Sequence, residues 1–242
     1  MSIWKKLSPD SFLLSNTVAH VWRAKLDYAE NQRNFFSKNL SQQELLQAKR
    51  FVKKTDQMKY IITKAIQRDI IARYLNVTQY EVTFELGEHG KPYLSNNLLQ
   101  FNLSHAGDWL LIGVTKSSSI GVDIECEKRK LDSLALAKRF FSEQEFQTLS
   151  LLSEIERIDA FYRMWTRKES FIKADGRGFA FPLNHFSVSA TETDQNTLLE
   201  VSSDQADAFD WQINSIKDFP SRYYGAVTTK RTIKNFFYWD WT

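Results

Sequence analysis

Between residues 56 and 75, apolar residues recur at intervals of three and four positions. This spacing places them along one side of an α-helix, the side that packs against a core. We expect Asp56 to cap the start of this helix and Asn76 to end it, because asparagine tolerates the left-handed conformation common at helix ends. The apolar positions are Met58, Ile61, Ile62, Ala65, Ile66 and Ile70.

Three further helices are predicted by their starts. The pattern Ser-x-x-Glu begins at Ser41, Ser142 and Ser153, and it has the form of a capping box, in which the serine and glutamate side chains bond backbone N–H groups. The helix after Ser153 is the longest of the three and runs to about Ala174. We expect Gly176 to end it, since glycine adopts positive φ without strain.

Alternating or continuous short apolar runs between turn residues predict strands. Together with the helices, these mostly meandering strands predict an α+β fold. The polar stretch 116–119 predicts a break between two halves, residues 1–118 and 119–242. The predicted strands are 82–86, 101–104, 109–115, 120–125, 186–190, 198–201, 211–216, 223–228 and 235–241.

Composition narrows the class of protein. The 242 residues are 43% hydrophobic, which suffices for a sizeable core, and the net charge is only +3. Such a mild charge lacks the basic stripe of a nucleic-acid binder but suits an anionic ligand or an acidic partner. Cys126 is the only cysteine, which excludes an internal disulfide and favours a reducing compartment. Without a signal-like or membrane-spanning apolar run, we expect a cytoplasmic protein that does not contact membranes.

Two acids share one side of the predicted strand at residues 121–125. Side chains alternate along a strand, so Asp123 and Glu125 project together. Neighbouring carboxylates repel each other unless a cation lies between them, and oxygen ligands of this kind suit Mg²⁺. The alternative is a strand edge with two solvent-exposed acids.

The long predicted helix carries a second group of polar residues. Trp165, Glu169 and Lys173 fall on one side of it, with apolar residues flanking Glu169. Glu169 then serves either as a third metal ligand or base, with Lys173 contacting a phosphate, or as one half of an ordinary i,i+4 ion pair with Lys173.

Two short segments add further candidates. Ser104 and His105 are adjacent in a predicted strand and point to opposite faces, so they do not form a nucleophilic pair. His105 is better placed to donate to a phosphate oxygen, with Gly107 allowing a close approach, although a lone histidine is more often structural. The turn Gly90-Lys91-Pro92 is either an ordinary surface turn or a contact for an anionic ligand.

Five blocks in order, GKP, FNLSHAG, IGVDIE, AKRFFSEQE and FYRMWTRKESFIKADGRG, resemble the 4′-phosphopantetheinyl transferase superfamily. The chain looks most like the surfactin-synthetase-activating type, and the resemblance runs from about Phe51 to Val188. It implies two similar α/β halves related by a pseudo-twofold axis, with the site between them. It also implies transfer of the phosphopantetheine arm of coenzyme A to a serine of a carrier protein, releasing 3′,5′-ADP.

The resemblance also implies roles for individual residues. Asp123, Glu125 and Glu169 would hold Mg²⁺, or Mn²⁺ in its place, with Glu169 also the general base. Lys173 would stabilise the leaving group. Lys59 falls where the family has an arginine, so this contact lacks the planar guanidinium. The residues implied in binding coenzyme A are Lys59, Gly90, Lys91, Pro92, Ser104, His105, Lys168 and Lys173.

The implied acceptor is an acidic acyl carrier protein or peptidyl carrier domain. We expect it to contact the loop 128–130 and the helix 134–141, and we expect a monomer. Two alternatives are open. A metal-dependent phosphodiesterase would use the three carboxylates but leave the GKP and SHAG blocks without a role. A non-catalytic carrier-binding protein would have no need of all three carboxylates.

Overall fold

The computed structural model describes residues 2–7, 12–28, 32–87, 90–95, 98–127, 131–178, 181–191, 198–201 and 210–241. The helices are α1 (Arg33–Ser37), α2 (Gln42–Ala48), α3 (Lys54–Leu75), α4 (Ser133–Phe140), α5 (Glu143–Ser150) and α6 (Glu154–Asp175), with a short 3₁₀ turn at Leu183–His185. The strands are β1 (Trp4–Lys6), β2 (Val18–Lys25), β3 (Phe84–Leu86), β4 (Pro92–Leu94), β5 (Gln100–Ala106), β6 (Trp109–Thr115), β7 (Ile120–Cys126), β8 (Phe186–Val188), β9 (Leu198–Val201), β10 (Trp211–Ile216), β11 (Tyr223–Lys230) and β12 (Asn235–Asp240).

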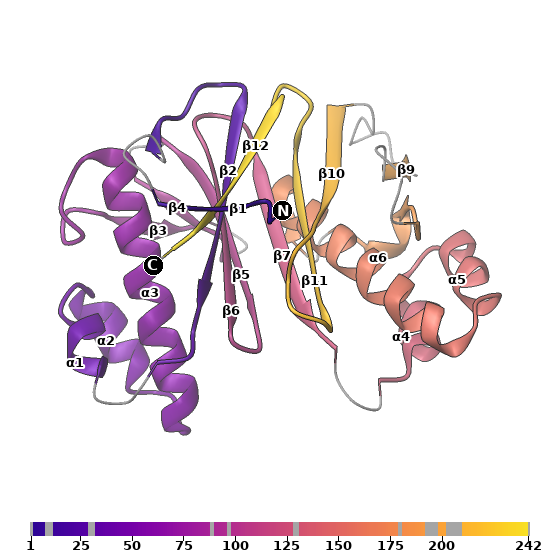
Figure 1. The fold of residues 1–242 in the computed structure, drawn as a ribbon, viewed down its shortest axis with the longest axis horizontal. Coiled ribbons are helices and arrows are strands. Elements are labelled where there is room, and N and C mark those ends of the chain that lie inside the picture. The colour runs from indigo at the N-terminus through magenta and orange to yellow at the C-terminus, as the bar shows by residue number, and fades with distance from the viewer. Residues whose placement is uncertain are drawn as a thin grey trace.

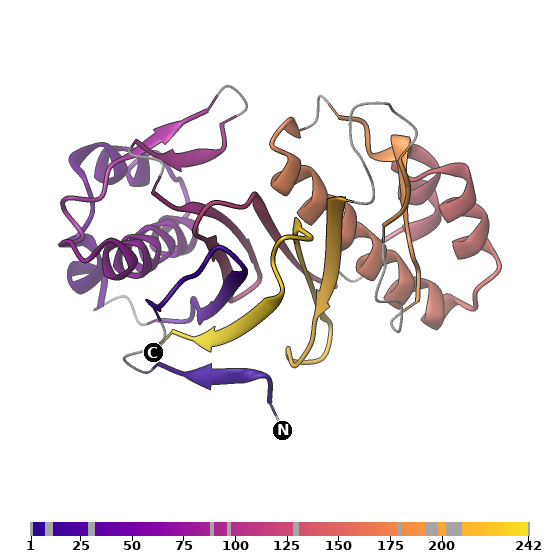
Figure 2. The same cartoon turned by 90° about the horizontal axis from the view of Figure 1, so that it is seen from above.

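Two sheets lie side by side in the middle of the molecule, with the long helices α3 and α6 on opposite sides of them, and α4 and α5 lie beyond α6 (Figures 1 and 2). The larger sheet has the order β1-β12-β2-β6-β5, and the smaller has the order β10-β11-β7. Strands β2, β6 and β5 are antiparallel, whereas β12 runs parallel to β2. The mixture of helices and mainly antiparallel sheets confirms the predicted α+β class.

The helix starts and ends largely follow the predicted chemistry. Capping boxes are present at Ser41, Ser142 and Ser153. Helix α3 ends at Asn76 with φ of 54° and α6 ends at Gly176 with φ of 91°, both in the left-handed region. One cap was predicted wrongly, because α3 begins three residues earlier, after Lys53, and Asp56 lies in its first turn. An acid there still opposes the positive end of the helix dipole.

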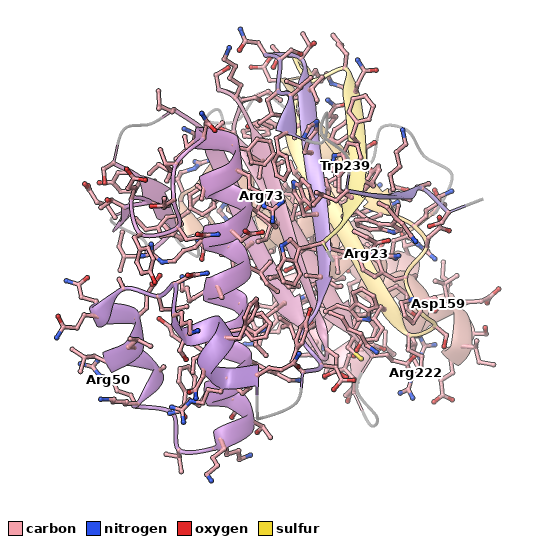
Figure 3. The ribbon with its side chains drawn as sticks, turned by 60° about the vertical axis from the view of Figure 1, so that its left-hand side comes forward. Arg23, Arg50, Arg73, Asp159, Arg222 and Trp239 are labelled. Atoms are coloured by element: carbon pink, nitrogen blue, oxygen red, sulfur yellow. The ribbon has the colours of Figure 1, made fainter. Side chains whose placement is uncertain are left out.

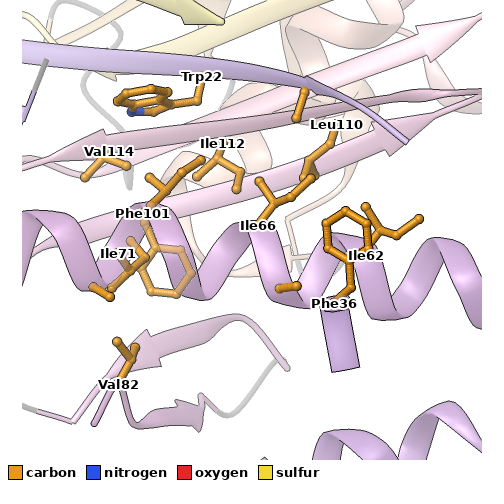
Figure 4. Close-up of a cluster of buried hydrophobic side chains, with 14 of the residues drawn as sticks. Trp22, Phe36, Ile62, Ile66, Ile71, Val82, Phe101, Leu110, Ile112 and Val114 are labelled. Atoms are coloured by element: carbon orange, nitrogen blue, oxygen red, sulfur yellow. The ribbon is translucent and has the colours of Figure 1, made fainter. Parts of the chain in front are cut away.

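The first core lies between α3 and the larger sheet. Figure 4 shows Ile62, Ile66 and Ile71 of the helix facing Trp22 and Phe101 of the strands. All five side chains are buried, so the stripe predicted for this helix does pack against a core. A second core packs α6 against the smaller sheet and α4. A third lies between the two sheets and includes Val21, Leu111, Val122 and Val227.

The chain ends join the two sheets. Arg23 on β2 is labelled in Figure 3. It donates to both carboxylate oxygens of Asp240 on β12, at 2.5 and 3.1 Å, and to the backbone oxygen of Asp218 at 2.7 Å. Its guanidinium also lies 4.4 Å from the ring centroid of Trp4 on β1. Asp218 belongs to the loop between β10 and β11, so this cluster ties the chain ends to the smaller sheet. The division at residue 118 stays a prediction, and β12 from the far end of the chain lies in the larger sheet.

None of the helices among the described residues is both long and apolar enough to span a membrane.

Candidate active site

The predicted carboxylates lie where β7, β5 and α6 meet. Asp123 is at the middle of β7 and only 3% exposed. Its Oδ1 accepts hydrogen bonds from Ser104 Oγ at 2.9 Å and from Lys173 Nζ at 2.6 Å. Its Oδ2 is buried and has no hydrogen-bond partner among the described residues. Burial raises the pKa of Asp123, while the charge of Lys173 opposes the rise.

The pKa of Glu169 depends on the same group of charged side chains. Burial is the main reason that its pKa is raised to about 7, and the negative charges of Asp123 and Glu125 add to the effect. Lys173 acts in the opposite direction. The fold therefore brings the three acids that the sequence singled out within electrostatic reach of one another. A carboxyl group with a pKa near 7 can accept a proton at neutral pH.

The three acids repel each other, and their donor atoms suit a hard cation. Among the described residues no group of three acidic, histidine or cysteine side chains is arranged to ligate a metal. Instead, the Lys173 ammonium donates a hydrogen bond to Asp123. The buried, unpartnered Oδ2 of Asp123 is the kind of oxygen that a divalent cation satisfies. In this respect the chemistry of Asp123, Glu125 and Glu169 fits Mg²⁺.

Lys59 and His105 line one cavity between α3 and β5. It holds about 380 Å³, and its walls also include Phe51, Tyr60, Lys64 and the acid Asp56. The His105 side chain is exposed, yet desolvation by its neighbours lowers its pKa, and the charges of Lys173 and Lys59 lower it further. Two lysines and two aromatic rings in the wall suit a phosphorylated aromatic ligand, whereas Asp56 opposes an anion at its own end of the cavity.

Lys59 also holds the turn that follows His105. Its Nζ donates to the backbone oxygen of Gly107 at 2.7 Å and to Asp108 Oδ1 at 2.9 Å. From the other side, Tyr223 Oη accepts from the Asp108 N–H at 3.3 Å. Gly107 has φ of 55°, and a Cβ there would lie 2.1 Å from Tyr223 Oη. Glycine is therefore required at this turn for both conformation and space.

The GKP turn faces the end of α6. Lys91 Nζ donates to the backbone oxygen of Lys173 at 2.6 Å, and burial lowers the pKa of Lys91 to about 8. Lys91 and Pro92 line a cavity of about 340 Å³ that also includes Asp175. Gly90, at the turn itself, has φ of 76°. The turn thus lies close to the backbone of Lys173, at the boundary between the first and second cores.

Lys168 lies elsewhere. It is 0% exposed, and its ammonium donates to both oxygens of Glu145, at 2.8 and 2.7 Å, and to the backbone oxygen of Phe186 at 2.5 Å. A lysine ammonium has three N–H donors, so all are used inside the second core. The position of Lys168 therefore does not support the phosphate contact expected from the sequence.

Two side chains near the site were missed by the sequence analysis. Asn102 accepts a hydrogen bond from the Val122 N–H at 2.9 Å, next to Asp123. Tyr223 supports the turn at Gly107. Asn102 stands in the FNLSHAG block, so its place in the motif was a signal, but which backbone group it binds depends on how β5 and β7 are brought together. No local pattern marks Tyr223.

Comparison with known proteins identifies the family of the chain. The profile described as "4'-phosphopantetheinyl transferase superfamily" matches residues 119–228, and the one described as "4'-phosphopantetheinyl transferase, N-terminal" matches residues 27–117. The 4'-phosphopantetheinyl transferase HetI of Nostoc sp. is 35% identical over 195 residues, which cover 79% of this chain and 81% of that protein. The 4'-phosphopantetheinyl transferase Sfp of Bacillus subtilis is 37% identical over 164 residues, covering 67% and 71%.

The chain belongs to the 4′-phosphopantetheinyl transferase superfamily. As a transferase of this family it moves phosphopantetheine from coenzyme A to a carrier protein, and coenzyme A is its substrate.

Proposed function

We propose that Asp123, Glu125 and Glu169 together bind Mg²⁺, or Mn²⁺ in its place, at the junction of β7 and α6. The observation that carries the proposal is the buried, unpartnered Oδ2 of Asp123. The raised pKa of Glu169, about 7, supports it, because two other acids contribute to that rise. When bound, the cation neutralises charge on the coenzyme A pyrophosphate.

Glu169 then acts as the general base. It takes the proton from the hydroxyl of the carrier serine, whose oxygen attacks the β-phosphorus of coenzyme A. A new bond forms between the serine oxygen and phosphorus, and the bond from that phosphorus to the oxygen of 3′,5′-ADP breaks. The raised pKa of about 7 supports this role, since a carboxylate with such a pKa can accept a proton near neutral pH.

Lys173 meets the negative charge on the departing 3′,5′-ADP. Its side chain is 28% exposed and so retains access to solvent. In the free protein its ammonium lies on Asp123, 2.6 Å from Oδ1. Lys173 would leave Asp123 when a cation is bound there, because like charges repel, and its ammonium would then be available to the leaving group.

The coenzyme A phosphates and adenosine occupy the two cavities that β5 helps to line. Lys59 and His105 line one, and Lys91 with Pro92 lines the other, with Gly90 at the adjoining turn. Ser104 joins these contacts from β5, where its Oγ donates to Asp123 Oδ1 at 2.9 Å. Lys168 is left out of this assignment because its three donors are used in the core.

The acceptor is an acidic acyl carrier protein or peptidyl carrier domain. Lys138 and Arg139 in the last turn of α4 supply positive charge for it. The loop 128–130, expected to join this contact, lies outside the described residues. We further propose that the protein is a cytoplasmic monomer. Reversing the charges of Lys138 and Arg139 is expected to weaken carrier binding, and unchanged affinity would remove α4 from the interface.

The test of the reaction is the intact mass of an apo carrier protein after incubation with this protein, coenzyme A and Mg²⁺. We expect the carrier to gain one phosphopantetheine and Asp123→Ala to abolish the gain. A gain that survives in Asp123→Ala would exclude the proposed cation site while leaving the transfer reaction established.

The base is tested by Glu169→Gln. We expect kcat to fall by about 10²- to 10⁴-fold while coenzyme A affinity changes far less, because a general base acts in the transition state. Equal losses of kcat and coenzyme A affinity would assign Glu169 to binding alone.

A further inference from the structure

Strands β5 and β7 lie next to each other without a backbone ladder between them. The backbone of β5 pairs with β6, and that of β7 pairs with β11. Yet β5 and β7 are in extensive contact, since together they form the junction between the two sheets. The edge of β7 that faces β5 carries buried N–H groups, and each of these needs an acceptor.

Two side chains of β5 supply those acceptors. Asn102 Oδ1 accepts from the Val122 N–H at 2.9 Å. Ser104 Oγ accepts from the Ile124 N–H at 3.4 Å and donates to Asp123 Oδ1 at 2.9 Å. The two backbone N–H groups that flank Asp123 in sequence are thus both held from β5.

Asn102 is suited to accepting this hydrogen bond by its length and burial. It is 6% exposed, and its side-chain oxygen takes the place that a backbone carbonyl of a paired strand would have. Within the described part of the chain, Asn102 makes no hydrogen bond to a carboxylate of the candidate site, unlike Ser104. Asn102 therefore acts on the site through the backbone of β7.

We infer that Asn102 is a positioning residue: its amide oxygen fixes Val122 and thereby holds the carboxylate of Asp123 at the junction of β7 and α6. This inference rests on the proposed role of Asp123 in cation binding. A leucine at the same place fills a similar volume but leaves the Val122 N–H buried without an acceptor. The strand then moves to find water or another partner, and Asp123 moves with it.

Loss of a group that orients a metal ligand typically weakens metal binding by about 10- to 100-fold. We therefore expect Asn102→Leu to weaken Mn²⁺ binding by at least about tenfold, measured by electron paramagnetic resonance titration of the folded protein. Hydrogen exchange followed by nuclear magnetic resonance gives a second readout. The Val122 amide should exchange much faster in Asn102→Leu and should remain protected in Asn102→Asp, which keeps the accepting oxygen.

Gln212 offers a matched control on the far side of the smaller sheet. Its Nε2 donates to the backbone oxygens of Ile233, at 2.7 Å, and Lys230, at 3.2 Å. Like Asn102, it is therefore a side-chain amide that forms hydrogen bonds with the backbone. We expect Gln212→Leu to lower the midpoint of unfolding and to leave Mn²⁺ affinity unchanged. A purely structural role for Asn102 would give the same result as this control.

Asp123→Ala separates this inference from the proposal on which it rests. If Asp123→Ala abolishes Mn²⁺ binding and Asn102→Leu leaves it unchanged, Asn102 does not position the site. If Asp123→Ala also leaves Mn²⁺ binding unchanged, the proposed cation site is wrong and Asn102 has no cation ligand to position. Should Asn102→Leu not fold, Asn102→Ala replaces it, because the smaller side chain also lacks the acceptor and introduces no clash.

Discussion

Helix α6 carries two lysine–carboxylate pairs that differ in how completely they are satisfied. Lys168 and Glu145 are 0% and 2% exposed, and the Lys168 ammonium has three acceptors. Glu145 also accepts from the backbone N–H groups of Val188 and Ser142, both at 2.8 Å. Both carboxylate oxygens of this pair are thus satisfied, which compensates for the removal of both charges from water.

The second pair is incomplete. Lys173 binds only one oxygen of Asp123, and the other oxygen is buried without a partner among the described residues. Glu169 nearby adds a second acid, which is partly buried. A satisfied pair holds elements together, whereas a pair with an unmet oxygen and an acidic neighbour leaves its carboxylate available to a ligand. On the proposed assignment of the site, the difference distinguishes an ion pair that stabilises the fold from one that takes part in the reaction.

The largest effect is expected on stability, from Lys168→Met. The substitution leaves Glu145 buried with a charge and no cation, which typically costs about 3–5 kcal/mol of unfolding free energy. Chemical denaturation measures the loss. The cation site should be intact in the folded fraction, so Mn²⁺ affinity is the control. A loss below about 1 kcal/mol would mean that the pair contributes no more than a surface salt bridge.

The second prediction concerns the lysine of the incomplete pair and uses Lys173→Met. We expect kcat to fall by about 10²- to 10³-fold, because a cation is lost from the developing negative charge. Stability should fall by less than in Lys168→Met, because burial already raises the pKa of Asp123 and the acid can take up a proton instead. Steady-state kinetics and denaturation of the same sample test both parts. A severe loss of stability with normal kcat would reverse the roles of the two lysines.

The sequence predicted one member of this comparison better than the other. Helical spacing alone put Glu169 and Lys173 on one side of α6, and strand alternation put Asp123 beside Glu125. Spacing gave no sign that Lys168 is buried, because its partner Glu145 lies on another helix. Glu145 was predicted only as a capping residue, and it is both: one oxygen accepts from the Ser142 N–H and both accept from Lys168.

Sequence-distant pairing explains why one central strand was not predicted. Strand β2 (Val18–Lys25) was not predicted, although it is central to the larger sheet. It is buried on both faces along much of its length, so it lacks the alternation that marks a half-exposed strand. Its partner β12 comes from the other end of the chain, and no local pattern encodes that pairing.

Lys91 extends the comparison to a lysine that binds backbone oxygens. Its Nζ donates to the carbonyl of Lys173, and burial lowers its pKa to about 8 from an ordinary value of 10.5. Between pH 8 and 10.5 the unfolded chain therefore holds a proton that the folded chain has released. Stability rises with pH in that window, and below pH 8 the cost of protonating the buried amine is constant.

The third prediction follows from this rise in stability with pH. Relative to Lys91→Met, the wild-type protein should gain on the order of 1 to 2 kcal/mol as pH rises from 8 to 10.5, less than the full linkage value because the amine is only partly buried. Denaturation of both proteins across the window gives the difference, in which other titrating groups cancel. A flat difference would mean that Lys91 keeps an ordinary pKa and reaches solvent.

The smallest effect is expected from a double variant that replaces the ion pair of Lys168 and Glu145 with two uncharged side chains. In Lys168→Met with Glu145→Gln, the amide oxygen still accepts from the Val188 N–H, and only the Ser142 N–H at the start of α5 loses its side-chain acceptor. Because neither side chain is ionised, no charge is left unpaired, and the unfolding free energy should return to within about 1 kcal/mol of the wild type.

The matched double variant at the other pair, Lys173→Met with Asp123→Asn, serves as the contrast. It also removes an ion pair without leaving a charge, so stability should again be close to that of the wild type. Transfer of phosphopantetheine should nevertheless be lost in this variant and retained in the repaired Lys168 and Glu145 variant. If both double variants kept activity, or both lost it, a satisfied pair and an incomplete pair on α6 would have the same function. The distinction drawn from the unmet oxygen of Asp123 would then fail.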